Sequence, residues 1–183
     1  MIRPPANITS PSYVHKLVQL LQSEFSTGLT WLNRCFAITL RGVTDEGKYY
    51  PQIYNPLTGL NEDIRPDVDV SSYAFFETDE FEIPDYNESI EETYNLSVTF
   101  WGNLKQIDST KNYDFTSDLY KEVIAILKST TSYRDEAINV KVYINPEDVY
   151  SKYNDLIEKD TQFLMRPYTY FKITFSIDYK GRC

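Results

Sequence analysis

The residues best suited to chemistry are eight carboxylates between positions 77 and 92, a stretch without Lys or Arg. They are Glu77, Asp79, Glu80, Glu82, Asp85, Glu88, Glu91 and Glu92. Paired carboxylates serve glycosidases, but the acidic partner needs a cleft that raises its pKa, which a solvated loop does not offer. The spacing lacks the glycine-centred pattern of a calcium loop, so only loose calcium binding stays open. We therefore predict a solvated or partner-facing acidic loop.

Other reactive side chains are few. The single histidine, His15, lies beside the apolar stripe of a predicted helix and has no Cys neighbours to share a metal. Cys35 falls in a strand pattern, which predicts a small core residue rather than a nucleophile. The six glycines are scattered singly, and no GxGxxG or GK[ST] phosphate loop occurs. The sequence therefore predicts no catalytic residue, no metal site, no cofactor and no enzymatic activity.

Aromatic side chains accompany the acids, and this combination is typical of protein contacts, where aromatic anchors carry much of the binding energy. We predict partner contact through ten residues: Tyr73, Phe75, Phe76, Glu77, Asp79, Glu80, Phe81, Glu82, Asp85 and Tyr86. Packing of the same aromatic rings onto the protein's own sheet is the alternative.

Composition limits the partners. The chain has 183 residues, is 42% hydrophobic and carries a net charge of −9. Its basic residues are scattered, whereas a nucleic-acid or anionic membrane surface is bound by clustered Lys and Arg. No stretch approaches the roughly 20 apolar residues of a membrane helix. No secretory signal is visible and two cysteines suggest no disulfide framework, so we expect a reducing cytoplasm.

Three helices are predicted. Pro11 and an apolar stripe that ends at Phe25 predict a helix over 11–26. Thr116 or Ser117 is expected to cap a second helix over 117–129. Asn145 and Pro146 open a third, which we expect to continue to about Lys159.

Period-two alternation predicts strands over 31–41, 93–101, 138–144 and 168–179. Residues 48–54 are expected to return as the second strand of a hairpin, with Pro51 at an edge or bulge. The two-sided alternation of the last strand favours antiparallel pairing, with one face solvated or partnered. The fold class is therefore α+β: an antiparallel sheet of four or more strands with two to three helices on one face.

A single domain over 1–183 is expected, with residues 1–10 as an N-terminal arm. Residues 55–92 contain several prolines and most of the clustered acids, which predicts a projecting acidic insertion, either a loop or a β-hairpin. Short strands over 72–76 and 80–83 are expected within it.

This order of elements resembles that of bacteriophage tail completion or tail terminator proteins. The resemblance spans most of the chain and rests on the 170–179 closing strand, the 94–101 strand and the 123–127 helix. It implies a structural virion protein, of tail terminator or head–tail connector type, that forms a homo-oligomeric ring around the DNA channel. Neighbouring neck, portal or tail proteins would be its partners, acidic side chains would line the lumen, and no cofactor is implied.

Two other functions stay open at this point. The carboxylate run also suits an acidic adaptor or an inhibitor that mimics nucleic acid and binds a basic protein. A hydrolase that uses paired Asp or Glu residues, such as Glu80 and Glu82, is the third alternative.

Overall fold

The computed structural model describes residues 13–55, 58–66, 69–78, 91–132, 138–153 and 161–180. The predicted N-terminal arm over 1–10 and the predicted short strand over 80–83 lie outside these ranges. The helices are α1 (Tyr13–Gly28), α2 (Leu104–Ile107), α3 (Thr116–Ser132), α4 (Pro146–Val149) and the short 3₁₀ helix η1 (Thr161–Leu164). The strands are β1 (Arg34–Ile38), β2 (Leu40–Val43), β3 (Tyr49–Asn55), β4 (Leu60–Asp63), β5 (Ser72–Thr78), β6 (Glu91–Asn103), β7 (Ile138–Tyr143) and β8 (Tyr168–Lys180).

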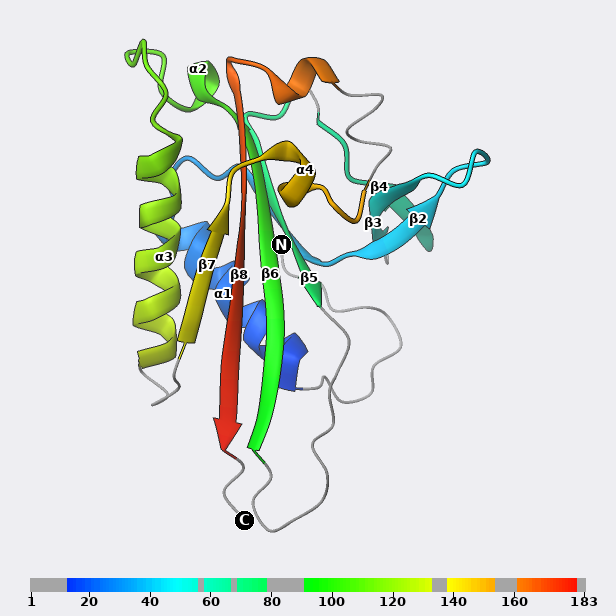
Figure 1. Ribbon diagram of the computed structural model, residues 1–183, viewed down its shortest axis with the longest axis vertical. Coiled ribbons are helices and arrows are strands. Elements are labelled where there is room, and N and C mark those ends of the chain that lie inside the picture. The colour runs from blue at the N-terminus through cyan, green and yellow to red at the C-terminus, as the bar shows by residue number, and fades with distance from the viewer. Residues whose placement is uncertain are drawn as a thin grey trace.

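The fold is α+β, as predicted, and is built on a five-stranded sheet of order β1-β5-β6-β8-β7 (Figure 1). The long strands β6 and β8 pair antiparallel over their whole length, from Glu91 opposite Lys180 to Asn103 opposite Tyr168. The expectation of a wholly antiparallel sheet is wrong at one edge, because β1 runs parallel to β5. The chain reaches β5 from β1 only after building a separate three-stranded sheet, β2-β3-β4, which allows the two strands to run in the same direction.

The main core lies between α1, α3 and one face of this sheet. Every second residue of the central strands points into it, as the alternation predicts: Leu96, Val98 and Phe100 from β6, and Phe171, Ile173 and Phe175 from β8. The helices contribute the stripes that the sequence indicates, among them Leu17, Leu21, Phe25, Leu119, Val123 and Leu127. Burial of two apolar helix stripes on one sheet face is the layered arrangement expected for α+β domains.

A second aromatic core covers part of the opposite face, which corrects the expectation of a solvated or partnered surface. Trp101 stacks between Tyr73 and Tyr168, with ring centroids 5.2 and 5.3 Å away. α4, η1 and the segment before β5 cover these rings with Val149, Tyr150, Tyr153, Phe163, Ile64 and Val70. The sheet is therefore buried on both faces in this region, and its inner strands carry apolar residues on both sides.

The predicted first and second helices are confirmed, but the third is much shorter than expected. Asn145 caps α4 by accepting a hydrogen bond from the Glu147 N–H, and Pro146 occupies the first turn, as predicted. The helix ends at Val149, however, and 150–152 form a turn. The turn directs Tyr150 and Tyr153 into the second core, so the apolar spacing of this segment serves a compact turn rather than a long helix.

The predicted hairpin is confirmed in part, because the strand predicted over 31–41 divides into β1 and β2, and only β2 pairs with β3, across a turn at Thr44–Gly47. The hairpin belongs to a separate sheet that projects from the body (Figure 1). Pro51 lies in the central strand of that sheet, not at an edge. The Pro51 carbonyl accepts a hydrogen bond from the Ile64 N–H, just past the end of β4. The Pro51 nitrogen, which has no hydrogen to donate, therefore faces a position where the pairing of β3 with β4 has already ended.

The predicted insertion over 55–92 is wrong in part. Strand β5, which lies inside that range, is an inner strand of the main sheet, paired with β1 on one side and β6 on the other. Strand β4 belongs to the projecting sheet.

Candidate functional site

The residues predicted to touch a partner divide into two groups. Tyr73, Phe75, Phe76 and Glu77 lie on β5 and are at most 3% exposed, so the prediction that they form a contact surface is wrong. The tyrosine and phenylalanine rings pack into the two cores, which was the alternative for these aromatics. Asp79, Glu80, Phe81, Glu82, Asp85 and Tyr86 lie outside the described residues.

Glu77 forms an ion pair inside the sheet. Its Oε2 lies 2.7 Å from Lys172 Nζ on β8, and the two side chains are only 3% and 6% exposed. The Ser97 and Thr99 hydroxyls on β6, the strand between them, each donate to the same oxygen over 3.3 Å. A buried charge is tolerated when it is paired and hydrogen-bonded in this way. We assign this group a structural role, because it joins three strands.

Tyr153 and Cys35 are the buried groups with the clearest pKa shifts. Burial, together with the nearby Glu77 carboxylate, raises the pKa of the Tyr153 phenol, whose oxygen lies 3.2 Å from Thr39 Oγ1. Burial raises the pKa of the Cys35 thiol to about 12. Cys35 packs against the main core, as predicted. A thiol must ionise to act as a nucleophile or metal ligand, and a raised pKa opposes this ionisation.

His15 lies half-buried on α1. Across the described residues, no three His, Cys, Asp or Glu side chains are grouped so that they could hold a metal ion. No helix in the described part of the chain is both long and apolar enough to cross a membrane.

The projecting sheet β2-β3-β4, which we call the arm, has two unlike faces. On one face the Gln52 amide donates to the Tyr50 hydroxyl and to Asp63, each over 3.0 Å. The Gln52 and Tyr50 side chains cover Gly42 so closely that any Cβ there would collide with them. On the other face Val43 and Tyr49 form a cross-strand pair beside the turn. Val43 is 56% and Tyr49 37% exposed, and Arg41 stacks on the Tyr49 ring at 4.4 Å.

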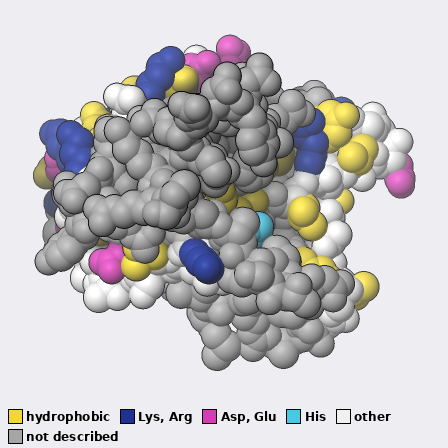
Figure 2. All heavy atoms as spheres, turned by 90° about the horizontal axis from the view of Figure 1, so that it is seen from below, with side chains coloured by type: hydrophobic (Ala, Val, Ile, Leu, Met, Phe, Trp, Pro, Cys, Tyr) yellow, Lys and Arg dark blue, Asp and Glu magenta, His cyan; other side chains and the backbone are white. Residues whose placement is uncertain are grey.

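The outer end of the arm combines these apolar side chains with charge. Asp45 and Glu46 are exposed in the turn, and Lys48 pairs with Glu46 at 3.4 Å. Figure 2 shows hydrophobic side chains on the projecting part at the right and an acidic group at its far end. We call the group formed by Val43, Asp45, Glu46 and Tyr49 the arm tip. Leu40 and Leu60 add two further exposed apolar residues to the arm.

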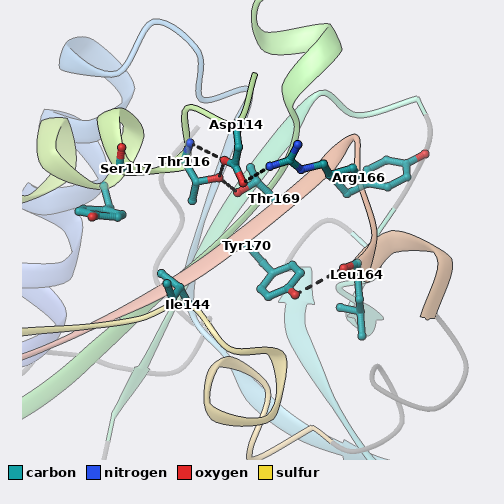
Figure 3. Close-up of a pocket in the computed structure, with 10 residues that line it drawn as sticks. Asp114, Thr116, Ser117, Ile144, Leu164, Arg166, Thr169 and Tyr170 are labelled. Atoms are coloured by element: carbon teal, nitrogen blue, oxygen red, sulfur yellow. Dashed lines mark hydrogen bonds and ion pairs between the residues drawn. The ribbon is translucent and has the colours of Figure 1, made fainter. Parts of the chain in front are cut away.

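A cleft lies on the other side of the molecule, where α3 begins and β8 starts (Figure 3). It has a volume of about 490 Å³ and is lined by residues from α3, the end of β7, η1 and β8, including Tyr120, Ile144, Leu164 and Tyr170. A second hollow of about 240 Å³, lined by Lys105, Lys111 and Tyr113 among others, shares Asp114 and Arg166 with it. We call the two together the Arg166 cleft.

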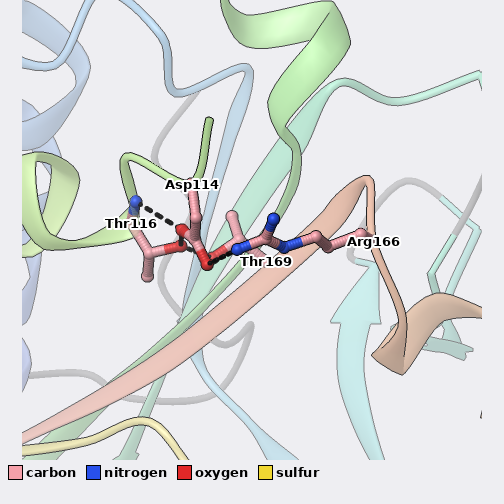
Figure 4. Close-up of polar contacts among 4 residues, drawn as sticks. All are labelled: Asp114, Thr116, Arg166 and Thr169. Atoms are coloured by element: carbon pink, nitrogen blue, oxygen red, sulfur yellow. Dashed lines mark hydrogen bonds and ion pairs between the residues drawn. The ribbon is translucent and has the colours of Figure 1, made fainter. Parts of the chain in front are cut away.

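A polar network fixes the floor of this cleft (Figure 4). Asp114 accepts from the Thr116 N–H over 3.0 Å and from the Thr116 hydroxyl over 2.6 Å, and its other oxygen pairs with Arg166 at 3.3 Å. Because the Thr116 proton is directed at Asp114, the contact between the two threonine hydroxyls requires Thr169 to donate to Thr116. Asp114 therefore caps α3, a role that the sequence analysis assigned to Thr116 or Ser117.

The hydrogen bonds from Thr116, and after them Arg166, hold the pKa of Asp114 below its ordinary value of 3.8. A group whose pKa is lower in the folded state than in the unfolded state stabilises the fold. This stabilisation is present above the pKa of the unfolded state and is lost as the pH falls through the pKa of the folded state. We therefore expect Asp114→Ala to lower the free energy of unfolding by about 0.5–2 kcal/mol at pH 7, with the difference from wild type shrinking below about pH 4.

Urea unfolding followed by circular dichroism at pH 7 and pH 3 measures this effect. Asp118→Ala is the matched control, because it removes an acid from the first turn of α3 and none of the Asp114 contacts. An equal loss from both variants at pH 7 would show that charge at the helix start, and not the cap, is responsible.

The sequence analysis missed both the arm tip and the Arg166 cleft. Val43 was available as a β-branched residue between the predicted strands over 31–41 and 48–54. The cleft had no signal of its own, because Asp114 and Arg166 lie 52 positions apart and meet only when β8 passes the start of α3. No protein-family model, no curated protein and no solved structure matches the chain.

Proposed function

We propose that the protein is a structural subunit that binds copies of itself and forms a ring around the DNA channel at the neck or tail of a bacteriophage. The proposed ring is of the tail terminator or head–tail connector class, as the resemblance in element order implies, and would lie next to other neck, portal or tail proteins. The observation that carries the proposal is the arm, a projecting sheet that exposes apolar side chains.

The arm has the properties of an association element. Its outer strands β2 and β4 pair only with β3 in the described part of the chain, so backbone donors and acceptors along both edges are open to another strand. Exposed apolar residues concentrate there: Leu40, Val43, Tyr49 and Leu60. Proteins normally blunt or cover such edges, and an apolar surface on a projection favours a contact with another chain.

The charge of the protein suits the proposed passage of DNA. With a net charge of −9, the chain as a whole repels the phosphate backbone. A channel wall that binds phosphates would release condensed counterions and retain the DNA, whereas an acidic wall lets it pass. The proposal therefore involves no sequence-specific binding of nucleic acid.

Val43→Glu is expected to shift the purified protein from a multimer toward a monomer, because the new carboxylate would be buried in the apolar contact without a partner. Light scattering coupled to size-exclusion chromatography measures the mass. Ala125→Glu, at an exposed position of α3, adds the same charge away from the arm and should keep the wild-type mass.

A wild-type protein that stays monomeric at all concentrations, and that joins no particle when mixed with phage neck or tail proteins, would overturn the proposal. A monomer that instead co-purifies with a basic protein would support the acidic adaptor.

A further inference from the structure

We infer that the Arg166 cleft of one subunit receives the arm tip of the next, so that copies of the chain join head to tail. This inference rests on the proposed function and names the partner surface that completes it. The arm supplies the projecting half of the contact and the Arg166 cleft supplies the receiving half.

The positions of the two surfaces favour this arrangement. The arm projects from the side of the sheet where β1 and β5 lie, whereas α3, β7 and β8 lie toward the other side (Figure 1). The Arg166 cleft is lined by residues of α3 and β8 and by Ile144, which follows β7. A contact between two different surfaces on opposite sides of a subunit is heterologous. Such contacts close into rings when the rotation between subunits allows it.

Charge at the two surfaces is complementary. The arm tip presents the exposed carboxylates of Asp45 and Glu46, of which Glu46 also pairs with Lys48 at 3.4 Å. The Arg166 cleft gathers three cations, Lys105, Lys111 and Arg166, in a chain with net charge −9. Asp108 and Asp114 pair with Lys111 and Arg166 and offset part of that charge. The side chain of Arg166 is nevertheless 73% exposed, which leaves its outer donors accessible to an incoming carboxylate.

Apolar side chains at the two surfaces are complementary as well. Ile144 lines the cleft and is 63% exposed, and Met165, which precedes Arg166 in the chain but does not itself line the cleft, is 67% exposed. These residues are suited to cover the apolar pair Val43 and Tyr49 of an arriving tip. An apolar centre with charged groups around it is the usual anatomy of a specific protein interface.

The test uses charge reversal on each side of the contact. A tip variant carries Asp45→Lys and Glu46→Lys, a cleft variant carries Lys105→Glu and Arg166→Glu, and a third protein carries all four substitutions. The tip variant alone and the cleft variant alone should each lose self-association by about a hundredfold or more, because like charges then face each other. An equimolar mixture of the two, and the fourfold variant by itself, should recover it, since opposite charges meet again at every junction.

Each outcome has a distinct meaning when mass is followed by light scattering across a concentration series. If the wild type assembles and both variants assemble equally well, the docking inference is wrong while the proposed ring stands. If only the cleft variant is impaired, or if the mixture and the fourfold variant fail to recover, the arm tip is not what the cleft binds. If the wild type is strictly monomeric, the proposed function itself fails. Two controls separate misfolding from a lost contact. The first is thermal unfolding of each variant, and the second is Lys105→Glu alone, which leaves the Asp114 network intact.

Discussion

Replacing Lys172 with Met is expected to lower the free energy of unfolding by about 3–5 kcal/mol, one of the largest losses that any single substitution in this chain should cause. The ammonium group is 2.7 Å from Glu77, and both side chains are almost wholly inside the sheet. Without Lys172 the Glu77 carboxylate stays buried with neutral hydroxyls, those of Ser97, Thr99 and Tyr153, to compensate its charge. The cost is that of an unpaired buried charge rather than the intrinsic strength of the pair.

Urea unfolding of Lys172→Met, Glu77→Gln and the double variant measures this effect and separates its parts. Glu77→Gln keeps an acceptor for the hydroxyls but leaves Lys172 without its counter-charge, so it should also be destabilised. The loss of unfolding free energy in the double variant should be clearly smaller than the two single losses added together, because neither charge remains buried alone. A loss below about 1 kcal/mol for Lys172→Met would mean that water reaches the pair, in conflict with its burial.

The strands and helices that pack on the main core could be predicted from the sequence because each has a simple period. The alternation of Leu96, Val98 and Phe100 on β6 and the stripe of α3 are each determined by one buried face. The pairing of the strands was harder to predict. The parallel contact of β1 with β5 depends on where the chain goes after β4, and no residue in β1 signals it.

Strand β5 shows why the predicted contact surface was wrong. Its run from Tyr73 to Phe76 is almost continuously apolar, which is the pattern of a strand buried on both faces. The prolines before it and the acids after it favoured assignment to a projecting insertion instead. Glu77 was counted with those acids, although it pairs with Lys172, a residue far away in the sequence.

The short α4 illustrates a tertiary effect that overrides a correct local signal. Asn145 and Pro146 start the helix as the sequence indicates. Its length is set by the second core, since Tyr150 is 1% exposed and must turn toward Tyr170 on β8, whose ring is 5.8 Å away. Sequence periodicity did not reveal this core, because its members come from many separate segments between Phe36 and Tyr170.

Phe100→Ala is the second large effect, with an expected loss of about 3–5 kcal/mol in the free energy of unfolding. The ring is 1% exposed and lies at the centre of the main core. It stacks on Phe171 at 4.8 Å and contacts Phe25 on α1 at 5.8 Å, so it joins the sheet to the first helix. The substitution removes this burial and leaves a cavity that the surrounding strands cannot collapse to fill.

Phe100→Leu should cost much less than Phe100→Ala, because it keeps most of the apolar volume and loses mainly the ring contacts. Tyr113→Ala, which truncates a ring that is 60% exposed, is the control and should stay within about 1 kcal/mol of wild type. Chemical unfolding of the three variants under one condition gives the order directly. Equal losses for Phe100→Ala and Tyr113→Ala would contradict the position of Phe100 between β8 and α1, and with it the packing of the helix layer on this face of the sheet.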